Sequence, residues 1–446
     1  MQNMAGRHVA KKVIIVGAGI TGLTAAYHLI KSGLQVTVIE SSHDIGGLAT
    51  SISVDGVPVE KYYHFVCRGD HELINFISEL GLAEELHWKK GKTSYFIQNE
   101  IWPFNTPFDL MQFAPIPFAQ KVRFGVRILQ SQLKKEWVSL DKISAKKWLL
   151  KKFGPVVYFA IWDPLLRIKF GKFHEQVSAA WIWHRIHRVA KSRVSLLGGN
   201  VYGFLEHGCS TLFAKLLSTV TSSDAFRLVT GKSVKGIKIT DGRITGVILN
   251  DDDDFVSADA IISTIPIPAF LRLVSSDNDY FRRLREIDYL NIVCILFELQ
   301  EPIADCFWLN VNDPEIMFNG VVQMTNLNAR PDLGGSHLAY IPFYLHSSDP
   351  RWSFSDEEFY KVCAAGMKII QPRFDATLIK NWWVSRDLYA QAVCGVDFLD
   401  LMPGMETPVK GLYLTDSSQY YPEDRTLSAS VILGKTVSAM VANCVS

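Results

Sequence analysis

The sequence predicts an α/β fold, and three features of the chain carry that prediction. An apolar strand runs directly into a glycine-rich turn and a helix start at residues 13–30. A β-rich stretch with a tight-turn signal occupies residues 226–263, and a short apolar strand that ends in an acid precedes a last helix at 411–441. Such pieces are typical of a Rossmann-like parallel sheet with a β-meander. Because 446 residues exceed what one hydrophobic core usually serves, we expect a second, α+β domain interleaved with the first.

The first feature has the spacing of a dinucleotide site. The strand Val13–Val16 is followed by Gly17, Gly19 and Gly22. Gly17 allows the tight turn, Gly19 lets the backbone approach a pyrophosphate, and Gly22 lets the helix pack close to the strand. The phosphates then meet unpaired N–H groups at the positive end of the helix. The first residues of that helix are Ile20 and Thr21.

The second strand supplies an acid and a second glycine pair. Residues 35–39 have the pattern of a strand, and Glu40 stands at its end, where a carboxylate can accept hydrogen bonds from a ribose diol. Gly46 and Gly47 follow and give a flexible backbone that can wrap the same cofactor. An NAD site does not need this second pair. The other candidates for cofactor contact in this stretch are Ser41, Leu48 and Ala49.

These motifs together resemble the FAD-dependent oxidoreductases of the protoporphyrinogen oxidase and amine oxidase superfamily. Their FAD-binding signature is the glycine fingerprint, an acid and a following glycine pair. The segment 59–65 resembles the one that reaches the flavin ring in this superfamily, and also the histidine-bearing segment of UDP-galactopyranose mutase, another member. The resemblance implies that the cofactor is FAD and that His64 lies beside the isoalloxazine. A satisfied histidine in a domain seam is the alternative for His64.

The same resemblance gives roles to residues in the middle of the chain. It implies that the meander returns the chain to the FAD domain, with the backbone near Val234 touching the adenine. Residues 263–266 then end a strand of the cofactor sheet, and Thr264 is the contact residue. The segment 386–390 resembles an arginine-aromatic segment that passes near the flavin, which makes Tyr389 a candidate. Core packing is the alternative for this ring, because aromatic side chains bury much area.

The C-terminal motif is a strand, an acid and a helix start. In the superfamily the acid, here Asp416, holds a ribityl hydroxyl, and the start of the last helix, near Leu427, points at the flavin. A helix N-terminus stabilises the negative charge that reduction places on the ring. The segment 421–425 is similar to a Y-P-E-D-R segment in bacterial members linked with cell-surface polysaccharide synthesis, and its Tyr421 is a further catalytic candidate.

Composition and charge exclude other classes of function. The net charge of +1 gives no reason to expect nucleic-acid binding. The charge is unevenly spread, however, since residues 121–193 carry 17 Lys and Arg against 4 Asp and Glu. This basic segment can be a solvated face balanced by acids elsewhere, or it can meet an anionic substrate or an anionic membrane surface.

Cysteine and histidine usage predicts no metal site. The seven cysteines are scattered and never in C-x-x-C spacing, which argues against a disulfide framework, a zinc site or a redox dithiol. His184 and His187 can share a helix face, but no acid or cysteine lies nearby in the sequence. Without a signal peptide or a charge-free spanning stretch, we expect a cytoplasmic protein, with the inner face of the membrane as a place for peripheral contact.

The sequence supports one main functional hypothesis and two alternatives. The main hypothesis is an FAD-dependent oxidoreductase that transfers a hydride from a C–H or C–N bond to flavin N5, with His64, Tyr389 and Tyr421 as the candidates to orient substrate or move a proton. The alternatives are a flavin-dependent, non-redox mutase acting on a nucleotide- or lipid-linked sugar, and a flavin-binding protein without catalysis. The expected partner is a small molecule, with anionic and lipid-linked classes both open.

The predicted domains are interleaved along the chain. The FAD-binding domain is expected from residues 1–70, 198–267 and 393–446. The substrate domain is expected from residues 71–197 and 268–392. The substrate would lie between them.

Overall fold

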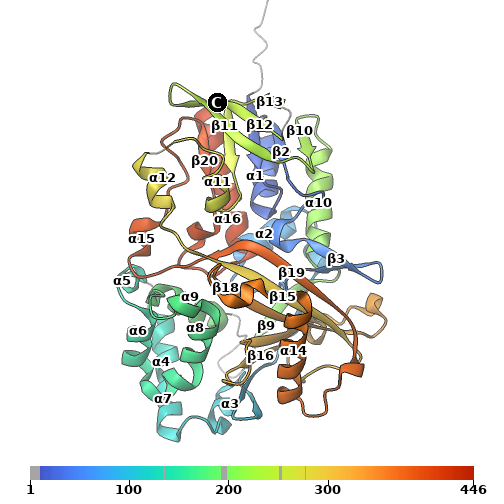
Figure 1. Cartoon of the computed structure of the whole chain (residues 1–446), viewed down its shortest axis with the longest axis vertical. Helices are drawn as coiled ribbons and strands as arrows, with labels where there is room; N and C mark the ends of the chain where they lie inside the picture. The colour runs from blue at the N-terminus through green and yellow to red at the C-terminus, as the bar shows by residue number, and fades with distance from the viewer. Residues whose placement is uncertain (1–10, 134–135, 192–197, 251–253, 277, 446) are drawn as a thin grey trace, which may run out of the picture.

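The computed structural model describes residues 11–133, 136–191, 198–250, 254–276 and 278–445. Its central layer is a five-stranded parallel sheet with the strand order β10-β2-β1-β14-β20. These strands are β1 (Lys12–Val16), β2 (Gln35–Ile39), β10 (Phe226–Val229), β14 (Ala260–Ser263) and β20 (Leu412–Leu414). Segments from the beginning, the middle and the end of the chain therefore share one sheet (Figure 1).

Two layers cover this sheet. Val13 and Ile15 face a helical layer, whereas Ile14 and Val16 face the β-meander on the other side, because successive side chains of a strand point to opposite faces. The helical layer contains α1 (Ile20–Lys31), α2 (His71–Glu79), α10 (Cys209–Thr221) and α16 (Leu427–Val445). The meander is β11 (Val234–Thr240), β12 (Arg243–Leu249) and β13 (Asp254–Ser257). The predicted turn at Asp241 and Gly242 joins β11 to β12, with φ of 50° and 73°.

The last helix is a core element. By length and composition the stretch Leu427–Cys444 could cross a membrane, but half of it is buried within the fold. At Gly434 a Cβ atom would lie only 2.5 Å from the carbonyl oxygen of Thr21, so α16 packs directly on α1. Lys435 forms an ion pair with Glu72 at 3.1 Å. These contacts fix the N-terminus of α16 beside the parallel sheet.

A second, larger sheet has seven strands in the order β19-β15-β18-β17-β16-β7-β8. Its strands are β7 (Thr93–Ile97), β8 (Glu100–Pro103), β15 (Tyr289–Leu299), β16 (Trp308–Val311), β17 (Gly320–Gln323), β18 (His337–Leu345) and β19 (Ile379–Ala392). Helix α14 (Asp356–Ile370) packs on one face of it through Phe359, Cys363 and Met367. Strands β7 and β8 pair as an antiparallel hairpin, with Pro103 at the end of β8.

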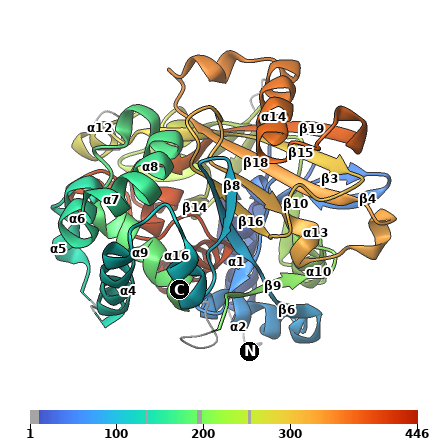
Figure 2. The same ribbon diagram turned by 90° about the horizontal axis from the view of Figure 1, so that it is seen from below.

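A helical group lies beside the seven-stranded sheet (Figure 2). Its helices are α4 (Phe118–Leu133), α5 (Val138–Asp141), α6 (Ala145–Phe153), α7 (Pro155–Val157), α8 (Asp163–Phe170) and α9 (Ala179–Lys191), with a π-helical turn at Tyr158–Trp162. The remaining strands are β3 (Ser51–Val54), β4 (Val57–Glu60), β5 (Val66–Cys67), β6 (Leu86–Lys90) and β9 (Val201–Leu205). The remaining short helices are α3 (Pro107–Gln112), α11 (Ile267–Phe270), α12 (Asp279–Leu284), α13 (Met324–Leu327) and α15 (Phe398–Leu401).

The strands follow the predicted interleaving of segments. All five strands of the parallel sheet fall within residues 1–70, 198–267 and 393–446, and all strands of the larger sheet fall within 71–197 and 268–392. Two elements cross this division, since α2 packs in the core of the parallel sheet and β9 pairs with β6. The domain boundaries themselves stay a prediction. Strand β9 ends at Leu205, and helix α10 follows it from Cys209.

Candidate active site

A cavity of about 810 Å³ lies where the parallel sheet, the larger sheet and the helical group meet. The cavity is lined by Gly17 directly after β1, the segment 62–65, parts of α3 and α4, and the loop before α16. The cavity therefore reaches from the predicted dinucleotide turn to the helical group.

The glycine turn forms a cradle at one end of the cavity. Gly17 has φ of +107°, and at Gly22 a Cβ atom would lie 2.1 Å from the carbonyl oxygen of Gly17. Helix α1 starts after Gly19 with no side-chain cap and no acid in its first turn. Its first N–H groups have no intrahelical partners and are available for phosphate oxygens. This end of the cavity fits a dinucleotide.

Glu40 and the second glycine pair complete the cradle. The carboxylate of Glu40 accepts hydrogen bonds from the N–H groups of Ala18 at 2.8 Å and Ser42 at 2.9 Å. The N–H of Gly46 donates to the carbonyl oxygen of Ala18 at 3.0 Å, which holds the second glycine pair against the first turn. Both loops thus lie side by side at the cavity wall.

Most of the predicted cofactor residues line the cavity. They are Gly17, Gly19, Ile20, Thr21, Glu40, Gly46, Gly47, Leu48, Ala49, Thr264, Asp416 and Leu427. Three do not: Gly22 serves helix packing, the hydroxyl of Ser41 donates to Glu40 at 3.2 Å, and Val234 starts strand β11. The contacts of these residues with the cofactor stay predictions.

Asp416 is a buried anchor at the C-terminal end of the parallel sheet. Its carboxylate accepts hydrogen bonds from the hydroxyl of Tyr289 at 2.7 Å and from the N–H groups of Ser418 at 2.7 Å and Ile267 at 3.1 Å. Burial raises the pKa of Asp416, and these hydrogen bonds oppose the shift. Asp416 thereby ties β15, α11 and the loop before α16 together at the cavity wall.

His64 lines the cavity as a neutral imidazole. Burial, aided by the positive charge of Arg425, lowers the pKa of His64 to about 4. Its Nδ1 atom is buried and has no hydrogen-bond partner among the described residues. On its other side, ligand atoms of Glu60, His64 and Cys209 lie within 4.8 Å of one another. This cluster could not be seen in the sequence, because its members come from two distant segments.

Tyr389 and Tyr421 have different positions. Tyr389 lies at a bulge in β19, with φ of +56°, and its ring reaches the cavity. Bulges commonly re-aim a side chain in this way. Tyr421, by contrast, is not among the residues that line the cavity. Its hydroxyl donates to Asp141 at 2.7 Å and pairs with Ser178 at 2.6 Å, so it joins the helical group to the C-terminal loop.

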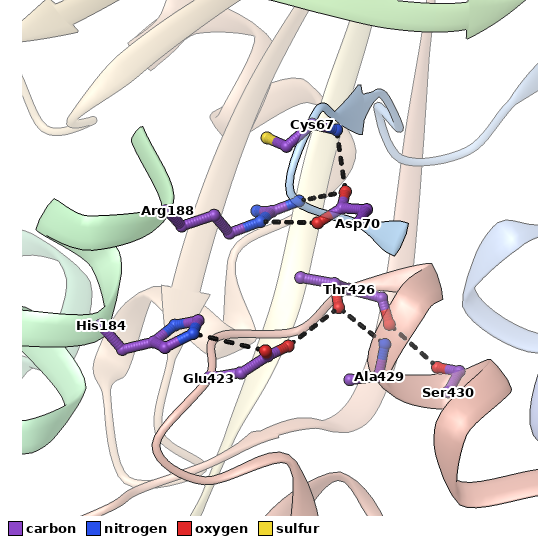
Figure 3. Close-up of polar contacts among 8 residues, drawn as sticks. All are labelled: Cys67, Asp70, His184, Arg188, Glu423, Thr426, Ala429 and Ser430. Carbon is purple, nitrogen blue, oxygen red and sulfur yellow. Dashed lines mark hydrogen bonds and ion pairs between the residues drawn. The ribbon is translucent and has the colours of Figure 1, made fainter. Parts of the chain in front are cut away.

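Ion pairs hold the loop before α16 to helix α9 (Figure 3). His184 lies 3.3 Å from the carboxylate of Glu423. Thr426, three residues further on, caps α16 by accepting the N–H of Ala429 at 2.9 Å. On the same helix as His184, Arg188 pairs with Asp70 at 3.0 Å. Helix α9 thus contacts the loop before α16 through His184 and the segment before α2 through Arg188.

The comparisons with known proteins agree with this architecture. A family model described as flavin containing amine oxidoreductase matches residues 20–422. The chain belongs to this family. It is therefore an FAD-dependent oxidoreductase, and FAD is the cofactor that the cradle fits.

Individual relatives are distant. Zeta-carotene desaturase of Synechocystis sp. is 22% identical over 97% of this chain and 97% of that protein. Mitochondrial protoporphyrinogen oxidase of Nicotiana tabacum is 29% identical over 35% of this chain and 32% of that protein. A crystal structure of reduced UDP-galactopyranose mutase matches 98% of this chain and 94% of its own, with 14% identity and a TM-score of 0.76. The structural match confirms the fold class.

Proposed function

We propose that the enzyme dehydrogenates an amphiphilic small molecule that it takes up from a membrane surface. One observation carries the proposal: a single cavity runs from the FAD cradle to helices α3 and α4, whose outer faces expose apolar side chains. The chemistry requires FAD, which when bound accepts a hydride from a C–H or C–N bond. The cytoplasmic location and the membrane contact are parts of this proposal.

The helical end of the cavity favours an apolar substrate part. Its walls include Phe104 and the α3 and α4 residues Leu110, Phe124, Ile128 and Leu129. Hydrocarbon walls exclude water from the reacting bond and stabilise an apolar chain in proportion to the area that it buries. A small polar amine alone would leave this part of the cavity unfilled.

The outer face of α4 supports membrane contact. Phe118, Val122, Val126 and Leu129 are 67%, 48%, 47% and 48% exposed. Their spacing places them on one face of the helix, and Phe108 and Met111 of α3 are exposed as well. Arg123 and Arg127 of α4 add the positive charge that binds anionic lipid headgroups. Leu129 is both exposed and part of the cavity lining, so the apolar face adjoins the cavity.

Two residues have suitable positions for handling substrate. His64 is neutral above about pH 5, because its pKa is about 4, so its imidazole can accept a hydrogen bond or a proton. Tyr389 presents its ring to the same cavity. We propose that His64 accepts the proton released on oxidation and that Tyr389 orients the substrate.

Flavin reduction tests the catalytic part of the proposal. The FAD-loaded protein is mixed anaerobically with candidate apolar and amphiphilic donors, and with short-chain amines as the comparison. We expect bleaching of the oxidised flavin bands only with donors that carry a long apolar part. Reduction by short amines with equal efficiency would contradict the proposal.

Vesicle binding tests the membrane part. We expect the wild-type protein to sediment with vesicles of phosphatidylcholine and phosphatidylglycerol, and less so at high salt. The double variant Phe118→Ser/Val122→Ser should bind at least about tenfold more weakly. Phe255→Ser is the matched control, because Phe255 is 52% exposed on β13, at the opposite end of the molecule (Figure 1). Equal losses in both variants would refute a specific role for α4.

The mutase alternative also has a structural observation in its favour. Tyr344 and Arg425 line the cavity together, and the guanidinium donates to the tyrosine hydroxyl at 3.1 Å. A tyrosine with an arginine is the kind of pair that a nucleotide pyrophosphate would need. A mutase would require chemically reduced flavin and would consume no electron acceptor, whereas a dehydrogenase requires oxidised flavin and an acceptor.

A further inference from the structure

Three cations surround one carboxylate at the wall of the cavity. Lys169 of α8 contacts Asp424 at 2.9 Å, and Arg185 of α9 contacts the same oxygen at 3.1 Å. Arg425 follows Asp424 in the chain, and all four side chains line the cavity. Lys169 is only 4% exposed, so its charge is held inside the protein. This arrangement leaves more positive than negative charge at one place on the wall.

Arg425 is the cation that lacks a carboxylate of its own. Within the part of the chain that the structure describes, its guanidinium forms no ion pair, and its hydrogen bond goes to the hydroxyl of Tyr344. The ammonium of Lys169 lies 4.7 Å from the centre of the Tyr344 ring, and the guanidinium of Arg425 lies 5.6 Å from it. Tyr344 is therefore placed between two positive charges. Arg425 is partly buried, and cations that are withdrawn from water are normally paired, so an anion is the expected ligand here.

The ionisation of neighbouring groups agrees with a positive potential at this place. Burial acts to raise the pKa of Tyr344, but the charges of Arg425 and Lys169 outweigh it, and the pKa is lowered. Burial raises the pKa values of the partly exposed Tyr95 and Tyr420, which line the same cavity. A field that stabilises a phenolate also stabilises the anionic group of a ligand.

We propose that Lys169, Arg425 and Tyr344 form a subsite for a carboxylate or phosphate group of the substrate. This inference rests on the proposed function and makes it more specific: the substrate is an amphiphile with an anionic group. Its apolar part lies along Phe124, Ile128 and the neighbouring cavity wall, and its anionic group meets the guanidinium of Arg425. The subsite then fixes which bond of the substrate faces the flavin.

Binding of simple amphiphiles tests the subsite without turnover. FAD-loaded protein is titrated with dodecanoate, dodecyl phosphate, dodecanol and dodecyltrimethylammonium, with inorganic phosphate as a further arm. Perturbation of the flavin absorbance and the shift of Tm report binding. We expect the two anions to bind at least about tenfold more tightly than the alcohol and the cation. The ratio of the affinities for dodecanoate and dodecyl phosphate identifies the preferred anionic group. If inorganic phosphate binds tightly and the amphiphiles do not, the inference that the substrate is an amphiphile is refuted.

Substitutions test whether Arg425 is responsible for the tighter binding of the anionic amphiphiles. Arg425→Met should weaken binding of the anions about tenfold and leave dodecanol unchanged, and Arg425→Lys should restore most of the loss. Arg167→Met is the control, because Arg167 is exposed on α8, pairs with Asp163 and does not line the cavity. Equal weakening for dodecanol, or an equal loss of FAD affinity in Arg425→Met, would overturn the subsite. If Arg425→Met does not fold, Tyr344→Phe and the ligand series on the wild-type protein still decide.

These outcomes are separable from failure of the proposed function. If the protein binds the anions selectively but none of the donors reduces its flavin, the subsite is supported and the proposed dehydrogenase activity is refuted. If uncharged apolar donors reduce the flavin and anions are not preferred, the dehydrogenase activity is supported and the subsite is refuted.

Discussion

The substitution Gly22→Ala probes the FAD cradle most directly. A Cβ atom at residue 22 would lie 2.1 Å from the carbonyl oxygen of Gly17, whereas ordinary contact begins at 3.4 Å. The two backbone segments must therefore separate by at least 3.4 − 2.1 = 1.3 Å. Because the obstructing atom belongs to the backbone, the cost is at the upper end of overpacking, about 3 kcal/mol.

The expected effect on FAD binding follows from that displacement. A shift of this size moves the first N–H groups of α1 out of hydrogen-bond range of the pyrophosphate. Each charge-assisted hydrogen bond contributes about 1.5–3 kcal/mol, so the loss of two weakens FAD binding by at least about 100-fold. We also expect the Tm of the apoprotein to fall by several degrees.

Gly19→Ala distinguishes an effect on FAD binding from an effect on the stability of the fold. Gly19 has φ of −72°, which suits any residue, and a Cβ atom there would meet nothing within 4 Å. This variant should leave the Tm of the apoprotein unchanged and still weaken FAD binding, since only the cofactor would be crowded. Gly404→Ala is the control, because Gly404 is equally open and lies outside the cavity.

The assays are titration of the apoprotein with FAD, followed by flavin fluorescence, and thermal unfolding of the apoprotein. If Gly19→Ala binds FAD as well as the wild-type protein does, the pyrophosphate does not lie at this turn. An unchanged apoprotein Tm in Gly22→Ala would refute the packing argument instead.

Three further predictions concern buried polar groups. The pKa of His64 is about 4 in the folded protein against about 6.5 when unfolded, so the unfolded state binds the extra proton and stability falls as the pH drops below about 6.5. From pH 7 to pH 5 this loss is about 2 kcal/mol, and His64→Gln should remove it from Tm profiles recorded against pH. Tyr421→Phe should cost about 2 kcal/mol, because it removes the shorter of two hydrogen bonds to the buried carboxylate of Asp141 and leaves only the N–H of Leu399 at 3.4 Å. Unfolding curves should show the loss while the flavin spectrum stays unchanged, and a changed spectrum would show that Tyr421 does contribute to the cofactor site. Asp416→Asn places an amide donor among three existing donors, so the Tm should fall. Fluorescence titration should show the FAD affinity reduced about tenfold. An unchanged affinity would exclude Asp416 from the cofactor site.

Local chemistry explains why much of the cofactor site could be predicted. A tight turn, a close helix approach and an anion-binding helix start each require glycine or unpaired N–H groups at fixed spacings, and Gly17, Gly19 and Gly22 meet those requirements within six residues. The apolar run before them could form only a buried strand. These short-range patterns predicted a dinucleotide site, and the family and FAD followed from the resemblance that the second glycine pair completes.

The substrate end could not be predicted in this way. Lys169, Tyr344 and Arg425 lie in a helix, a strand and a loop that are far apart in the sequence, and the Y-P-E-D-R segment that ends at Arg425 does not show which side chains meet it. The basic composition of residues 121–193 was visible, but not which side chains turn inward. Lys169 is buried beside Asp424, whereas Arg167, two residues earlier, is exposed.

The sequence by itself determined that a dinucleotide cradle forms, because its parts are neighbours along the chain or share a strand pattern of fixed period. Only the tertiary structure decided which charges meet around the cavity, that Tyr389 lines it while Tyr421 does not, and that one face of α4 exposes apolar side chains. The physical reason is that burial and ion pairing depend on distances between segments, and these distances are set when the two sheets and the helical group pack together.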